Sequence, residues 1–125
     1  IIDELPILFV ISALTKGISK FKNISDLRNK ESDRLKESKK ILDQIGIKCK
    51  VTLDDMIIYG EEKINILNKS MTINTKGDHR ICMSSTILSL ATGIKSEIKN
   101  FETVNTSFPG FINLIKNLGG KIAIK

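Results

Sequence analysis

Four charged side chains lie within five consecutive residues of this chain: Lys30, Glu31, Asp33 and Arg34. If the segment is helical, Lys30 and Arg34 share a face at a spacing of four, and Glu31 and Arg34 can pair at a spacing of three. Two cations near a helix start, where backbone N–H groups also point outward, can hold a phosphate or a carboxylate. The pattern predicts either an anion-binding site or a solvated helix start with internal ion pairs, and the second is the more common for surface charge.

Two further helix starts contain groups that could do chemistry. Asp78 after Gly77 is a typical N-cap, and Arg80 then lies at the positive end of the helix macrodipole, which is unfavourable unless an anion binds there. Asp3 precedes another expected helix, where ordinary capping explains it equally well. A neutral imidazole that caps or packs likewise explains His79.

Taken together, these helix starts hold both titratable groups and cations. The candidate proton-transfer groups are Asp3, Glu31 and His79. The candidate anion-binding cations are Lys30, Arg34 and Arg80. Charge-assisted hydrogen bonds contribute roughly 1.5–3 kcal/mol each, so two or three account for a micromolar anionic ligand.

The apolar pattern predicts an α+β chain. Helices are expected at 5–16, 31–45, 79–92 and 108–118, and strands at 18–24, 47–51, 56–59, 64–67, 71–74, 94–101 and 121–124. Gly17, Gly46 and Gly93 should end the helices that precede them. Asp54 and Asp55 form the expected hairpin turn, and the buried stripe of the second helix is Leu35, Ile41, Leu42 and Ile45.

The two halves of the chain resemble each other. Leu14–Ile18 matches Leu90–Ile94, and Lys22–Ile24 matches Lys99–Phe101. This predicts two copies of a helix–strand–helix–strand unit, over about 1–70 and 71–125, each burying its apolar face against its neighbour. Equivalent helix starts in such units, including a fourth at Ser107, can converge on one edge of the structure.

Composition argues against several classes of function. The net charge of +6 comes from 17 Lys and 3 Arg scattered along the chain, with one Tyr and no Trp, so the stacking surfaces of single-strand binders are missing. Cys49 and Cys82 belong to no zinc or disulfide pattern, which favours a reducing intracellular setting. The apolar segment 5–14 is too short to span a bilayer. Because the first residue is Ile1 and not Met, we expect a fragment of a longer protein.

Four motifs occur in order: Asp3–Pro6 (DELP), Leu27–Leu35 (LRNKESDRL), Gly77–Met83 (GDHRICM) and Thr106–Phe111 (TSFPGF). With them the chain resembles, over essentially its whole length, the C-terminal part of the 5-enolpyruvylshikimate-3-phosphate synthase family. The R-x-K-E-[ST]-D-R element is specific to that family.

The resemblance implies a reaction and an architecture. The reaction is transfer of the enolpyruvyl group of phosphoenolpyruvate to the 5-hydroxyl of shikimate 3-phosphate, with release of phosphate and without metal or organic cofactor. The family fold has two inside-out α/β barrel domains of three repeats each, with the active site between them. The chain would be an incomplete C-terminal domain of about two repeats from a bacterial cytoplasmic enzyme, and would be inactive without the N-terminal domain.

The resemblance also implies roles for single residues. Asp3 would handle the proton of the substrate hydroxyl, and Glu31 would protonate the methylene carbon of phosphoenolpyruvate. The residues implied for shikimate 3-phosphate are Asp3, Asp26 and Lys30. Those implied for phosphoenolpyruvate are Arg34, His79 and Arg80, and glyphosate, which competes with phosphoenolpyruvate, would meet the same arginines.

Two other interpretations are open at this stage. The sister enzyme that transfers enolpyruvate to UDP-N-acetylglucosamine shares the fold, although the R-x-K-E-[ST]-D-R element is not expected in it. A non-catalytic module that binds anions or nucleic acid fits the basic pI of about 9.4. A nucleic-acid binder would weaken steeply with salt and would show little preference for small phosphorylated acids.

Overall fold

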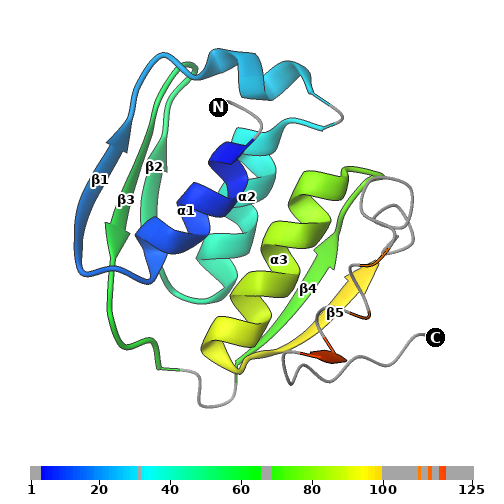
Figure 1. Cartoon of the computed structure of the whole chain (residues 1–125). Helices are drawn as coiled ribbons and strands as arrows, with labels where there is room; N and C mark the ends of the chain where they lie inside the picture. Colours follow the sequence, from blue (N-terminus) through cyan, green and yellow to red (C-terminus); the bar gives the residue numbers. More distant parts are fainter. Residues whose placement is uncertain are drawn as a thin grey trace.

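In the described part of the computed structural model of the chain, three α-helices pack against two small β-sheets (Figure 1). The structure describes residues 4–30, 32–65 and 69–99, together with positions 110, 113, 116 and 117. Helices α1 and α2 contact the first sheet, and α3 contacts the second. The described part has the α+β composition expected from the sequence.

The elements follow one another in this order. The helices are α1 (Leu5–Ala13), the 3₁₀ helix η2 (Ser25–Asn29), α2 (Arg34–Gln44) and α3 (His79–Thr92). The strands are β1 (Gly17–Phe21), β2 (Lys48–Val51), β3 (Met56–Gly60), β4 (Ser70–Asn74) and β5 (Lys95–Lys99). Among the described residues, no helix is both long enough and apolar enough to cross a membrane.

The two sheets differ in strand direction. In the first, β3 lies between β1 and β2 and is antiparallel to both, with Val51 opposite Met56 across the predicted hairpin turn. In the second, β4 and β5 are parallel, with α3 as the connection between them. Parallel neighbours require such a crossover, whereas antiparallel neighbours need only a short loop.

Side-chain and backbone caps set the ends of α2 and α3. The carboxylate of Asp33 accepts a hydrogen bond from Lys36 N at 3.1 Å, and α2 therefore begins at Arg34. The carboxylate of Asp78 does the same for the start of α3, and Gly93, with φ 77°, ends that helix as predicted.

Helix α1 ends earlier than the predicted residue 16, because its last carbonyl groups find partners outside the helix. Ala13 O accepts from Glu61 N at 3.0 Å, and Ile11 O accepts from the Thr15 hydroxyl at 2.8 Å. The last turn of α1 is thereby attached to the chain just after β3.

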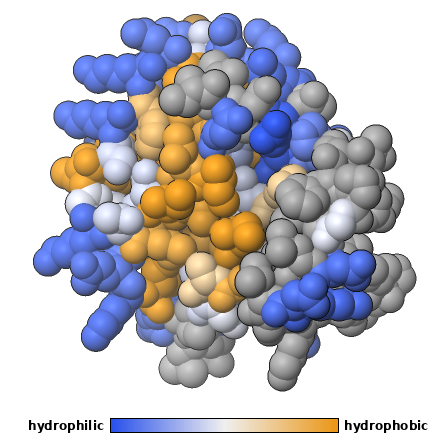
Figure 2. Space-filling view, viewed as in Figure 1, coloured by the Kyte–Doolittle hydropathy of each residue, from blue (hydrophilic) through white to orange (hydrophobic). Residues whose placement is uncertain are grey.

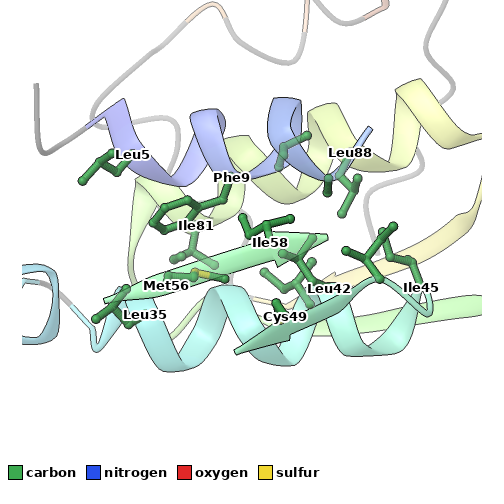
Figure 3. Packing of buried hydrophobic residues seen from close by; sticks show 14 of the residues in the cluster. Leu5, Phe9, Leu35, Leu42, Ile45, Cys49, Met56, Ile58, Ile81 and Leu88 are labelled. Atoms are coloured by element: carbon green, nitrogen blue, oxygen red, sulfur yellow. The ribbon is translucent and has the colours of Figure 1, made fainter. Parts of the chain in front are cut away.

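The core lies where α1, α2, α3 and β3 meet (Figure 3). The predicted stripe of α2 is buried at all four positions: Leu35, Ile41, Leu42 and Ile45. Met56 and Ile58 of β3 are fully buried against it. Burial of one such side chain stabilises the fold by about 1.5–3 kcal/mol.

An apolar face remains exposed. Figure 2 shows hydrophobic side chains gathered over the side of the molecule on which α1 and α3 lie in Figure 1. Ile11 of α1 is 54% exposed and Leu90 of α3 is 41% exposed. Contiguous apolar surface of this kind is typical of an interface with other protein.

Several predicted boundaries are wrong. The helix predicted over 31–45 begins only at Arg34, because Asp33 caps it and Lys30 is extended after η2, which was not predicted. The strands predicted over 18–24 and 94–101 are shorter, as β1 and β5, and residues 64–65 form no strand.

Part of the prediction lies outside the described residues: the strand over 121–124, residues 66–67 and 100–101, and most of the helix over 108–118. Positions 113, 116 and 117 of that helix are helical. The division into units of about 1–70 and 71–125 stays a prediction.

Gly60 at the end of β3 tests the contact with α1. A Cβ at this position would collide with the backbone carbonyl oxygens of Ser12, in α1, and Thr15, two residues after α1, and backbone atoms cannot rotate away. We expect Gly60→Ala to lower the free energy of unfolding by about 2–3 kcal/mol, measured by urea denaturation followed by circular dichroism. The control is Gly77→Ala, which meets open space and should lose about 1 kcal/mol through its φ of 80° alone. Equal losses in the two variants would contradict the close approach.

Candidate active site

The first residues of α1, α2 and α3 lie at one end of the molecule, and the chain of η2 lies beside them (Figure 1). This confirms, for the three described helix starts, the convergence predicted from the internal similarity. The fourth start, at Ser107, is outside the described residues. Unpaired backbone N–H groups and the positive ends of the helix dipoles make such an edge favourable for anions.

A buried ion pair joins the starts of α2 and α3. Arg34 Nε donates to Asp78 Oδ2 at 2.9 Å, and Arg34 Nη2 donates to Asp78 Oδ1 at 3.1 Å. The side chains are only 1% and 0% exposed. Ser32 Oγ donates to Asp78 Oδ2 at 2.7 Å, so the segment just before α2 is attached to the same carboxylate.

Asp78 also caps α3. Its Oδ1 accepts from Arg80 N at 3.0 Å and from Ile81 N at 3.4 Å. Burial by itself would raise the pKa of Asp78, but the hydrogen bonds from Arg34 and Ser32, the charge of Arg34 and the backbone bond from Arg80 more than offset it. The pKa of Asp78 therefore lies below its ordinary value of 3.8, and the carboxylate is charged at neutral pH.

A second ion pair supports the same junction. Lys76 Nζ lies 2.8 Å from Oε1 of Glu37, which is in the first turn of α2. Lys76 and Gly77 are both left-handed, with φ of 53° and 80°, and Asp78 N donates to Thr75 O at 2.8 Å. These values describe a tight turn that brings Asp78 to the start of α3.

Arg34 therefore differs from its predicted arrangement. The sequence predicted that Lys30 and Arg34 share one helix face, and this is wrong because Lys30 precedes α2 in extended conformation. The predicted pairing of Glu31 with Arg34 stays a prediction, since Glu31 lies outside the described residues. Arg34 is buried against Asp78, 44 residues further along the chain. The contact of Arg34 with phosphoenolpyruvate stays a prediction.

The other predicted site residues are distributed around this junction. Asp26, in η2, and Lys30, directly after it, are exposed. His79 and Arg80 are the first two residues of α3 and are half-buried. Asp3 and Glu31 lie outside the described residues.

Arg80 keeps the unfavourable position that the sequence indicated. It is the second residue of α3, and within the described part of the chain no acidic side chain forms an ion pair with it. A cation at this end of a helix is stabilised by an anion bound beside it. The start of α3 is thus suited to a negatively charged ligand.

The sequence did not predict the structural roles of two residues at the site. Asp78 was predicted as the cap of a helix but not as a partner of Arg34, and Arg28 was given no role. Arg28 Nη1 lies 2.8 Å from Asp33 Oδ2, and the same guanidinium donates to backbone carbonyls of the β2–β3 hairpin. A signal was present, since the chain has only three arginines and all three lie in the two charged motifs.

The cysteines are not candidate nucleophiles. Both are buried, and neither forms a disulfide within the described part of the chain. Burial raises the pKa of the Cys49 thiol, and the nearby Asp43 carboxylate adds to this, so that the pKa reaches about 11. A thiol is nucleophilic only as the thiolate, which is scarce at neutral pH with such a pKa. In the described ranges, no three His, Cys, Asp or Glu residues come together as a metal site would require.

Comparison with known proteins gives the family. Residues 1–115 match the sequence model of EPSP synthase (3-phosphoshikimate 1-carboxyvinyltransferase). The 3-phosphoshikimate 1-carboxyvinyltransferase of Acidiphilium cryptum is 38% identical over 121 residues, and that of Campylobacter jejuni subsp. doylei is 42% identical over 122 residues. A solved EPSP synthase structure from Acinetobacter baumannii has a TM-score of 0.85 at 33% identity, over 99% of this chain and 28% of that one.

The chain belongs to the EPSP synthase family, which confirms the resemblance found in the motifs. The match covers 97–98% of this chain but only 26–27% of these two relatives, so the chain spans about a quarter of their length. The α+β fold is that of part of an enolpyruvyl transferase, as predicted.

The buried ion pair can be tested by removing one charge. Asp78→Asn keeps a good N-cap and the shape of the side chain but removes the buried negative charge that Arg34 contacts, so we expect a loss of about 3–5 kcal/mol in the free energy of unfolding. The matched control is Asp43→Asn, which breaks the exposed pair with Lys39 and should change stability by less than about 1 kcal/mol. Adding Arg34→Met to Asp78→Asn should restore part of the loss, and additive losses would argue against the pair.

The lowered pKa of Asp78 also predicts a pH dependence. Its ionised form is favoured in the folded state, so its contribution is complete above the ordinary pKa of 3.8 and is lost as pH falls through the lower folded pKa. Between pH 5 and pH 2.5, urea denaturation should show the native sequence losing more stability than Asp78→Asn. Parallel curves for the two proteins would show that Asp78 does not titrate in this way.

Proposed function

We propose that this chain forms part of an enzyme that transfers the enolpyruvyl group of phosphoenolpyruvate to the 5-hydroxyl of shikimate 3-phosphate and releases phosphate. Family membership supports the reaction class. The observation on which the proposal depends is the contact of Ser32 and Arg34 with Asp78, because it brings the segment with Lys30 to the helix start with Arg80. No metal or organic cofactor is part of the proposal.

Each charged group has a role in the proposed reaction. Asp3 takes the proton of the attacking hydroxyl, and Glu31 protonates the methylene carbon of phosphoenolpyruvate as the new C–O bond forms. The tetrahedral intermediate then loses a proton from the resulting methyl group and expels phosphate. Both steps need a donor and an acceptor held among cations that balance the phosphate and carboxylate charges.

The binding roles divide between two parts of the site. Asp26 and Lys30, with Asp3, bind shikimate 3-phosphate, while Arg34, His79 and Arg80 bind phosphoenolpyruvate. The exposed positions of Asp26 and Lys30 and the position of Arg80 at the start of α3 are consistent with this division. Glyphosate would compete at the second group of residues.

The exposed apolar face over α1 and α3 supports a further part of the proposal (Figure 2). Ile11 and Leu90 are large apolar side chains that are exposed to solvent rather than buried in the core. The relatives are almost four times as long as the segment that matches this chain. We therefore infer that the remainder of an EPSP synthase packs on this face and supplies the other wall of the active site. On this basis the 125-residue chain alone does not turn over substrate.

The test is phosphate release from shikimate 3-phosphate and phosphoenolpyruvate, measured for the longest protein that the reading frame encodes and for this chain alone. We expect activity only in the long form. Glu31→Gln should lower kcat by about 10²–10⁴-fold, because it removes a proton donor. Arg80→Ala should raise the KM for phosphoenolpyruvate by about 10–100-fold through loss of a charge-assisted bond.

Lys95→Ala serves as the matched control, since Lys95 is an exposed cation on β5 away from the helix starts, and it should leave both constants unchanged. A long form that is inactive with these substrates but active with UDP-N-acetylglucosamine would replace the proposed substrate. Binding of nucleic acid that weakens steeply with salt, without turnover, would point to a binding module.

A further inference from the structure

The guanidinium of Arg28 joins three parts of the chain. Its Nε donates to Leu53 O at 2.9 Å, its Nη2 donates to Thr52 O at 2.6 Å, and its Nη1 donates to Asp33 Oδ2 at 2.8 Å. The two carbonyl groups belong to the β2–β3 hairpin loop, and Asp33 is the cap of α2. A planar guanidinium can make all three bonds at once, whereas an ammonium group cannot reproduce this geometry.

The β2–β3 hairpin loop is held in shape by hydrogen bonds of its own. Thr52 N donates to Asp55 O at 3.0 Å, and Asp55 N donates back to the Thr52 hydroxyl at 3.1 Å. The loop also holds the chain just before η2, because Ile24 N donates to Asp54 O at 2.7 Å and Asn23 N donates to the Asp55 carboxylate at 3.0 Å. The residues just before η2 and the Arg28 side chain within η2 are therefore attached to the same turn.

Arg28 lies between Asp26 and Lys30 in the sequence. Asp26 and Arg28 are both in η2, and Lys30 directly follows it. A 3₁₀ helix of five residues has little stability of its own, and its backbone orientation depends on outside contacts. The bonds of Arg28 to the hairpin and to Asp33 supply such contacts and fix η2 relative to the start of α2.

We propose that Arg28 is a positioning residue for the binding of shikimate 3-phosphate. It acts through the backbone of η2, holding Asp26 and Lys30 in their binding arrangement. This inference rests on the proposed function, and Arg28 has a different role from Arg34 and Arg80, which belong to the phosphoenolpyruvate side. The half-buried pair with Asp33 contributes little stability by itself, so the effect of Arg28 should fall on geometry more than on folding.

The test uses Arg28→Lys and Arg28→Gln in the longest protein that the reading frame encodes. Both variants should raise the KM for shikimate 3-phosphate by roughly tenfold or more, while the KM for phosphoenolpyruvate and the melting temperature change little. Arg28→Lys keeps the positive charge. A similar rise in the KM for shikimate 3-phosphate in both variants would therefore result from the lost hydrogen-bond geometry and not from the lost charge. A general loss of folded protein would lower the apparent kcat and leave both KM values unchanged.

The matched control is Lys39→Gln, which removes a cation from the exposed pair with Asp43 on α2 and should leave both KM values unchanged. Equal changes in the two KM values, or no change in either, would overturn the positioning role while leaving the proposed function intact.

A second measurement does not depend on activity. Amide hydrogen exchange at Ile24 and Leu27, whose N–H groups bond to Asp54 O and Ile24 O, should become at least about tenfold faster in both Arg28 variants but not in Lys39→Gln. If the unsubstituted protein lacks the proposed activity, the proposed function fails on that result. Unchanged exchange in the Arg28 variants would separately show that Arg28 does not hold η2.

Discussion

The buried pair between Arg34 and Asp78 is the interaction on which the rest of this site depends. Transferring two charges out of water costs several kcal/mol per ion, and the pair offsets this only because both nitrogen–oxygen contacts are short and Asp78 has further donors from Ser32 and the α3 backbone. An apolar pair could stabilise the junction as well but could not cap α3. The ion pair thus fixes two helix starts relative to each other and leaves the next residues, His79 and Arg80, at the edge.

The same carboxylates serve as caps and as links. Asp33 caps α2 and receives Arg28, while Asp78 caps α3 and receives Arg34. A continuous series of bonds therefore runs from the β2–β3 hairpin through η2 and α2 to the start of α3. Such a series restricts the backbone around exposed charged side chains, and charges fixed in this way can bind an anion with little reorganisation.

The chain is short beside its relatives, and part of its apolar surface is exposed. It matches about a quarter of the length of its relatives in the EPSP synthase family, and its apolar face over α1 and α3 is only partly covered. The starts of α1, α2 and α3 lie at one end of the described part. The buried core among α1, α2, α3 and β3 nevertheless shows that this part has an apolar interior of its own.

Residue types and their local spacing were enough to predict the limits of one helix, the buried face of another and the family. The limits of α3 follow from Asp78 before it and Gly93 after it, the stripe of α2 follows from helical spacing, and the charged motifs identified the family. Only the tertiary structure decided the start of α2 and the partner of Arg34. A spacing of four placed Lys30 on one helix face with Arg34, but α2 begins only after its cap Asp33, and Arg34 bonds to Asp78, 44 residues away. Periodicity reports contacts within one element, whereas a buried ion pair is set by how separate elements pack.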